Sequence, residues 1–177
     1  MSRIVYKIIS FTFLCALALG LCASSSVDQQ SVKIKSAYLI NFVRFISWPE
    51  SNKERISIGF LGANKLEDYI IKTKSIAEKR ARLKINLIHF NEPDSVLNCD
   101  ILYTENTKYL KKYPELIQYC SDNNILLVTS RTLKFPANSC INFLIVNSKL
   151  RFEINHELLK NNNLKASAQL LKLSYKR

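Results

Sequence analysis

Residues 31–49, SVKIKSAYLINFVRFISWP, decide the fold because they combine a long apolar helix with a clear stop. Apolar and aromatic residues recur at helical spacing, and Ser31 is placed to cap the first turn. Pro49 is expected to close the helix, because a residue before proline is pushed out of the α region. A helix that is apolar over most of its circumference must be covered on more than one side. The cover is either the rest of the domain or a partner protein. Polar residues are left mainly on the stripe of Lys33, Ser36, Arg44 and Ser47.

The segment before this helix has the pattern of a secretory signal. Arg3 and Lys7 precede the apolar run Ile8–Leu21, and small residues follow it up to Ser25. The run is shorter than the roughly 20 residues that cross a bilayer as a helix. A cleaved signal is therefore favoured over a permanent membrane anchor.

We expect residues 1–25 to be removed as a signal peptide and the mature protein to be exported. The remaining 26–177 are long enough for a single domain. A cut after Gly20 is an alternative. Lipidation at Cys22 is another, although Leu21 is bulky where a lipoprotein signal needs a small residue.

The charge of the chain suggests what it binds. Its formal net charge is +12 at pH 7, which a nucleic-acid-binding protein could carry. The lysines are spread through many segments, however, and an exported protein rarely meets nucleic acid. We expect a solvated basic surface and no nucleic-acid partner, with attraction to anionic headgroups or an acidic partner surface as the alternative.

The remainder of the chain alternates short apolar runs with helical patterns. This alternation predicts an α/β fold: a mostly parallel sheet of five to six strands flanked by helices on both faces, with an antiparallel edge hairpin. Pro114 is expected to split the second of the two helices that lie between strands. The strands are expected at 56–61, 83–90, 100–104 and 124–129, those helices at 65–74 and 107–120, and a helical turn at 93–97.

The C-terminal part predicts the edge hairpin. Ile141–Val146 and Leu150–Ile154 are strand-like, and the three residues 147–149 form the loop between them. Asn155 is placed to cap a final helical region, which the run 161–163 interrupts. The basic segment 78–82 is expected to link the helix at 65–74 to its following strand.

Motifs for catalysis are missing from the sequence. Gly59 and Gly62 lie between a strand and a helix, but the Walker lysine and a third glycine are absent. His89 and His156 have no partner at metal-ligand spacing, and there is no nucleophile elbow or Cys-x-x-Cys pair. We therefore expect no enzyme activity, cofactor or metal.

The cysteines suggest a disulfide. Cys99, Cys120 and Cys140 remain after removal of the leader, and an oxidising compartment favours pairing. A helix that follows a strand in a βα unit returns antiparallel to it. Its end at Cys120 should therefore lie near the strand's start at Cys99. Three buried, unpaired thiols are the alternative.

Four segments together resemble the YfiR-like family of periplasmic proteins: KIKSAYLINFVRFISWP at 33–49, CDILY at 99–103, RFEIN at 151–155 and SAQLLKL at 167–173. The resemblance covers almost the whole mature chain. It implies a non-catalytic regulator that binds the periplasmic sensor part of an inner-membrane diguanylate cyclase and represses it, thereby limiting cyclic di-GMP and biofilm growth. One departure is that no cysteine lies seven residues to either side of Cys140, where some members have a second bridge.

Candidate partner-binding residues come from the two ends of the chain. Because the first helix is so apolar, part of it is expected to stay accessible for a partner or a homodimer. A periplasmic small-ligand-binding protein is the alternative function, and it would need a polar pocket at the C-terminal ends of the strands. An enzyme would need a histidine beside Cys or Ser. The candidate binding residues are Leu39, Val43, Ile46 and Trp48 in the first segment, and Arg151 and Glu153 in the edge hairpin.

Overall fold

The computed structural model describes residues 29–49, 53–62, 65–81, 83–93, 98–105, 107–130 and 138–176. The predicted signal peptide and Cys22 lie outside these residues, as does most of the turn predicted at 93–97. No helix within the described ranges is long and apolar enough to cross a bilayer.

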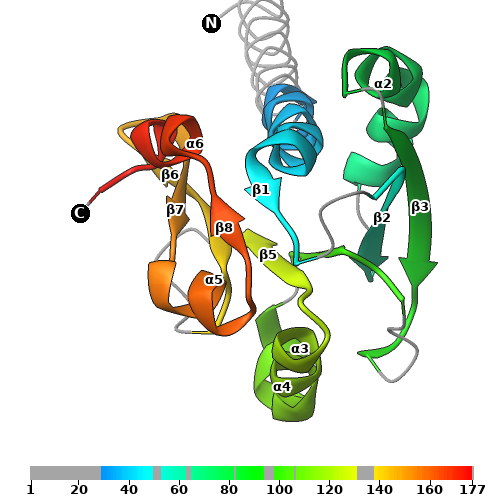
Figure 1. The fold of residues 1–177 in the computed structure, drawn as a ribbon. Helices are drawn as coiled ribbons and strands as arrows, with labels where there is room; N and C mark the ends of the chain where they lie inside the picture. The colour runs from blue at the N-terminus through cyan, green and yellow to red at the C-terminus, as the bar shows by residue number, and fades with distance from the viewer. Residues whose placement is uncertain are drawn as a thin grey trace, which may run out of the picture.

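Six strands form one sheet in the spatial order β3–β2–β4–β5–β6–β7 (Figure 1). Neighbouring strands are parallel, except that β6 and β7 form an antiparallel hairpin at one edge. The central strands are apolar without interruption, because both of their faces are covered. The strands are β2 (Arg55–Leu61), β3 (Lys84–Phe90), β4 (Ile101–Thr104), β5 (Leu126–Ser130), β6 (Ile141–Val146) and β7 (Lys149–Ile154).

Helices cover both faces of this sheet, so the predicted α/β architecture is confirmed (Figure 1). One face is covered by the helix of residues 29–45, called the first helix below, with α2 (Lys65–Ala81), α5 (His156–Asn161) and α6 (Ala168–Leu173). The other is covered by α3 (Thr107–Lys112) and α4 (Pro114–Asp122). These two helices are separated at Tyr113, as Pro114 predicted.

The core has a separate apolar cluster on each face. Under the first helix, Phe42 packs against Phe143 and Phe152 with ring centroids 5.9 and 5.5 Å apart. Under α3 and α4, Leu102 and Leu127 of the sheet meet the helices. Gly59 is required here, because a Cβ would lie 2.6 Å from the Phe90 ring.

The first helix differs from its prediction at both described ends. Residues 29 and 30 are already helical, so Ser31 lies inside the helix and does not cap it. The pattern missed this because glutamine, which occupies both positions, is a good helix former. The helix ends at residue 45 and not at Pro49, because the next residues, β1 (Ile46–Ser47), pair antiparallel with β8 (Lys165–Ala166). This small sheet joins segments far apart in sequence and was not predicted.

Two further boundaries were wrong. Helix α2 continues to Ala81, so the expected link at 78–82 is mostly helix. Glu78 contributes to this end of the helix by accepting a 2.8 Å hydrogen bond from the Ile85 amide. The hairpin turn consists of Asn147 and Ser148 alone, because Val146 pairs directly with Lys149. Both turn residues have positive φ, 49° and 60°, as a tight hairpin turn requires.

The capping prediction at Asn155 is confirmed. Its side chain accepts a 3.1 Å hydrogen bond from the Leu158 amide and starts α5. Ser167 caps α6 in the same way through the Leu170 amide, at 3.2 Å.

Candidate partner-binding surface

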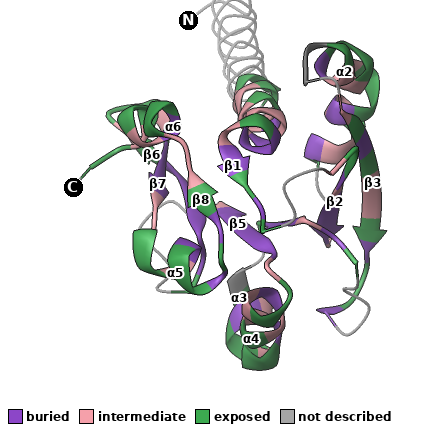
Figure 2. Ribbon diagram, viewed as in Figure 1, coloured by how far each residue is buried: buried purple, intermediate pink, exposed green. Residues whose placement is uncertain are grey.

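The first helix buries one side against the sheet and leaves the other side accessible (Figure 2). Leu39 and Phe42 are fully buried, and Tyr38 packs on Phe152 with ring centroids 4.9 Å apart. Burial of this aromatic side fixes the rotation of the helix. The residues on its far side are therefore held in place for contacts outside the domain.

The sequence analysis selected the buried side of this helix. Leu39, Val43 and Ile46 are only 0%, 8% and 4% exposed, so the expectation that part of them stays accessible is wrong for the isolated chain. The physical reason is that α2, α5 and α6 join the helix on one face and complete its burial. A role for these side chains in partner binding stays a prediction. Binding through them would need the helix to move away from the sheet.

Trp48 is also buried, and its indole Nε1 has no hydrogen-bond partner within the described part of the chain. The Ser36 hydroxyl, in the middle of the first helix, is the other buried side-chain atom without one. An unpaired buried polar group costs free energy. Both atoms lie in the segment that the sequence analysis placed at the centre of the fold.

A polar network ties the first helix to the C-terminal end of β4. The Lys35 ammonium and the Tyr103 hydroxyl both donate to Glu105 Oε1, at 2.8 and 2.6 Å. Burial, and then the charge of Glu105, raise the pKa of Tyr103 above its usual range, so its hydroxyl remains a donor. The network holds the helix in one register along the sheet.

A groove opens on the accessible side, between the first helix and α2, and is called the interhelix groove below. Its volume is about 240 Å³. The side chains that line it are mostly apolar, and a cation of the first helix, Lys33 or Arg44, lies towards each end of the groove. It is lined by Lys33, Ala37, Ile40, Asn41 and Arg44 of the first helix and by Tyr69, Thr73, Ile76 and Ala77 of α2.

The hairpin candidates lie on the opposite edge of the molecule from α2. Arg151 is exposed and Glu153 is 5% exposed, although alternation places both on one face of β7. Glu153 stands opposite Asn142 of β6, whose Oδ1 accepts a 3.0 Å hydrogen bond from Thr129. Arg151 is therefore the accessible member of the pair, and a partner role for either stays a prediction.

The three cysteines of the described ranges are buried, free thiols, and the Cys99–Cys120 bridge stays a prediction. Both residues belong to the cluster under α3 and α4, whereas Cys140 belongs to the cluster on the other face. Burial, and then the other two thiols, raise the pKa of Cys120 above its usual range. Burial, with a contribution from Asp100, raises the pKa of Cys99 to about 12, and burial raises that of Cys140 to about 11. Neutral thiols of this kind are poor nucleophiles.

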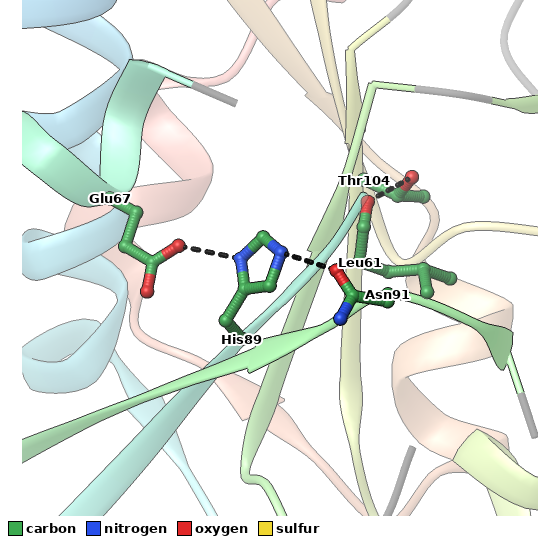
Figure 3. A network of polar contacts seen from close by, with 5 residues as sticks. All are labelled: Leu61, Glu67, His89, Asn91 and Thr104. Atoms are coloured by element: carbon green, nitrogen blue, oxygen red, sulfur yellow. Dashed lines mark hydrogen bonds and ion pairs between the residues drawn. The ribbon is translucent and has the colours of Figure 1, made fainter. Parts of the chain in front are cut away.

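A second polar network lies at the C-terminal ends of β2 and β3 (Figure 3). His89 Nδ1 lies 2.8 Å from Glu67 of α2, and its Nε2 lies 3.1 Å from Asn91 Oδ1. Thr104 donates to the Leu61 carbonyl at 3.1 Å. The histidine thus joins α2 to an edge strand. Across the described ranges, no group of three His, Cys, Asp or Glu residues could hold a metal ion.

Comparison with known proteins identifies the family. A sequence profile of the YfiR/HmsC-like family matches residues 32–175. This chain belongs to the YfiR/HmsC-like family. At the level of the family, YfiR/HmsC-like proteins are periplasmic regulators of diguanylate cyclase signalling and are regulatory rather than catalytic. A search of curated proteins finds no match.

Two solved structures show a distant likeness. One is an ABC domain from Streptococcus pneumoniae in complex with L-Trp, with a TM-score of 0.47 and 11% identity, covering 67% of this chain and 55% of that chain. The other is a conserved domain protein from Vibrio cholerae O1 biovar El Tor, with a TM-score of 0.47 and 10% identity, covering 84% of this chain and 58% of that chain. The matched region thus spans little more than half the length of either of those chains.

Sequence reasoning missed Tyr103, Glu105 and Lys35. Glu105 directly follows a strand, where polar groups gather in α/β folds, and this signal could have marked it. The tie to Lys35 spans 70 positions and has no local pattern. The interhelix groove was missed because the accessible side of the first helix depends on how α2 packs.

Proposed function

We propose that this protein binds the periplasmic sensor part of an inner-membrane diguanylate cyclase and represses it. The observation that carries the proposal is the family match over residues 32–175, which spans nearly every described element. The accessible groove beside the first helix supports a binding role. The buried thiols offer no activated nucleophile to support a catalytic one.

For the interhelix groove, partner binding is favoured over small-ligand binding. The interhelix groove of about 240 Å³ is smaller than the roughly 300–1,000 Å³ typical of small-molecule pockets. It lies between two helices, not in the polar pocket at the strand ends that a ligand-binding function would need. Protein side chains suit such a groove better than a complete small molecule does.

The proposal includes the route and organisation of the protein. Residues 1–25 act as a cleaved signal peptide, residues 26–177 form one periplasmic domain, and the domain can form a homodimer. N-terminal sequencing of the periplasmic protein tests the cut, with a new terminus at Ser26 as the expected result. A terminus at Cys22 carrying a lipid would overturn it. Sedimentation of the purified domain tests the dimer.

Two measurements test the main proposal. Crosslinking in intact cells, followed by affinity purification and mass spectrometry, should recover an inner-membrane protein with a diguanylate cyclase domain. Deletion of this protein should raise cyclic di-GMP, and the rise should disappear when that cyclase is also deleted. A version without residues 1–25 is the control, because it stays in the cytoplasm and should not repress. An unchanged cyclic di-GMP level on deletion would refute repression.

A further inference from the structure

The interhelix groove lies on the accessible side of the first helix, away from the side that the domain buries. The first helix and α2 both rest on the same face of the sheet, and their inner residues share one apolar cluster. Between them, Ala37 and Ile40 face Tyr69 and Ile76 across the groove. Ile76 is 57% exposed, so apolar surface reaches from the groove to the solvent. Such a surface has the composition of a binding site for apolar side chains.

The charges at the groove are of one sign. Lys33 and Arg44 are exposed, and neither forms an ion pair with another residue in the described ranges. Both lie on the groove side of the first helix. They lie eleven positions apart along the helix, which corresponds to a rise of about 16 Å. Arg44 lies over the Phe45 ring, with its guanidinium carbon 5.6 Å from the ring centroid, and this contact leaves its charge without an anionic partner in the described ranges. Two cations at this spacing complement two anions about three helical turns apart on a partner.

From this geometry we infer that the groove binds an amphipathic helix of the partner protein, which inserts apolar side chains between the first helix and α2. Acidic residues of that helix, about three turns apart, lie opposite Lys33 and Arg44. The inference rests on the proposed function, because it assigns the helix to the periplasmic part of the cyclase. Helix-in-groove recognition reads apolar anchors on one helical face, which suits a narrow groove between two helices.

Charge and shape disfavour the other occupants. A second copy of the exported domain also carries a formal net charge of +10 once the two cations of residues 1–25 are removed, so cations would meet cations unless the contact were highly selective. A flat bilayer surface cannot enter a groove recessed between two helices. The volume of about 240 Å³ accommodates a few side chains rather than a drug-sized molecule.

Site-specific photocrosslinking of the full exported protein in intact cells tests the location. A photoreactive residue replaces Ala37 or Ile76 in the groove, Ile145 in the edge hairpin, or Gln118 on α4. We expect the cyclase to be captured from positions 37 and 76 and not from 118. Peptide mapping should place the crosslink in a helix with acidic residues about three turns apart.

The outcomes separate the two proposals. Capture of the cyclase from position 145 alone would overturn the groove and leave the proposed function intact. Capture of a second copy of this chain from positions 37 and 76 would make the groove a dimer interface and overturn the inference. Absence of the cyclase from every crosslink and from the affinity purification would refute the proposed function itself.

Affinity measurements on purified variants complete the test, using a synthetic peptide of the mapped segment. Ala37→Trp should weaken binding about tenfold or more by filling the groove, whereas Ser75→Trp, on α2 but outside the groove, should not. Lys33→Glu should weaken binding about threefold and reduce its salt dependence, whereas Lys111→Glu on α3 should change neither.

Circular dichroism confirms that each variant is folded. Unchanged peptide binding by Ala37→Trp would overturn the inference. The inference would also be overturned if the protein bound phosphatidylglycerol vesicles in a Lys33-dependent way and did not bind the peptide.

Discussion

The two faces of the sheet are closed in different ways. Under α3 and α4, the cover comes from the short stretch of chain between β4 and β5, and its contacts are mostly local. Under the first helix, the cover is assembled from both ends of the chain and includes α2, α5 and α6. The face built from distant segments therefore has seams between its helices, and one seam is the interhelix groove.

The difference indicates where binding can evolve without loss of the fold. A local βα unit closes its own core and has little apolar surface to spare. A face assembled from several helices is stabilised by an aromatic centre, where Phe42 meets Phe143 and Phe152, and its periphery stays accessible. The comparison predicts that the two faces respond differently to mutation, oxidation and pH.

The largest difference is expected for truncation of the core. Phe42→Ala should lower the free energy of unfolding by about 3 to 5 kcal/mol, because a fully buried ring is lost from the centre of the assembled face. Leu116→Ala under α4 should cost about 2 to 3 kcal/mol. Urea unfolding measures both, with Ile76→Ala as an exposed control that should change stability by less than about 0.5 kcal/mol. A larger loss for Leu116→Ala would reverse the comparison.

Oxidation should act on the local face. We propose that exported protein carries the Cys99–Cys120 bridge, because both thiols lie in the cluster under α3 and α4, whereas Cys140 lies in the cluster on the other face. The bridge should add about 3 kcal/mol of stability relative to the reduced protein. Non-reducing peptide mapping should join these two residues and leave Cys140 free. A Cys120–Cys140 peptide would show instead that the oxidised protein links the two faces.

In protein that carries the Cys99–Cys120 bridge, Cys140 is the remaining thiol of the described ranges, so alkaline pH should act on the assembled face. In reduced protein the local face should lose stability as well, because burial raises the pKa of Cys99 to about 12. Burial raises the pKa of Cys140 from 9.0 to about 11, so the folded state favours the neutral thiol. This contribution to stability is complete below about pH 9 and is lost as the pH rises towards 11, because the unfolded thiol ionises first. The loss should be on the order of 2 kcal/mol. Urea unfolding at pH 8 and pH 11 should show it as the difference between wild type and Cys140→Ala; identical pH dependence in both proteins would contradict it.

The two faces also differ in how far the sequence could predict them. On the local face, the βα order and the split at Pro114 follow from local patterns, and each was found. On the assembled face, the cap at Asn155 was also found, because a cap is a local pattern too. The accessible side of the first helix depends on which distant elements pack on it, so Leu39 and Val43 were placed on the wrong side. The β1–β8 pair was missed for the same reason, because two-residue strands have no periodicity to detect.

The smallest effects are expected from the polar tie between the first helix and β4. Tyr103→Phe should cost about 1 kcal/mol, because the buried hydroxyl loses its 2.6 Å hydrogen bond to Glu105. Lys35→Gln should cost only about 0.5 kcal/mol, because the Glu105 side chain is 44% exposed and solvent screens the ion pair.

Adding 1 M salt should reduce the Lys35 effect and leave the Tyr103 effect unchanged, because only the ion pair depends on long-range charge. A double mutant should be less destabilised than the sum of the two single changes if Glu105 joins both donors. Strict additivity would mean that the two contacts act independently and that the Tyr103 hydroxyl does not help to position Glu105 for Lys35.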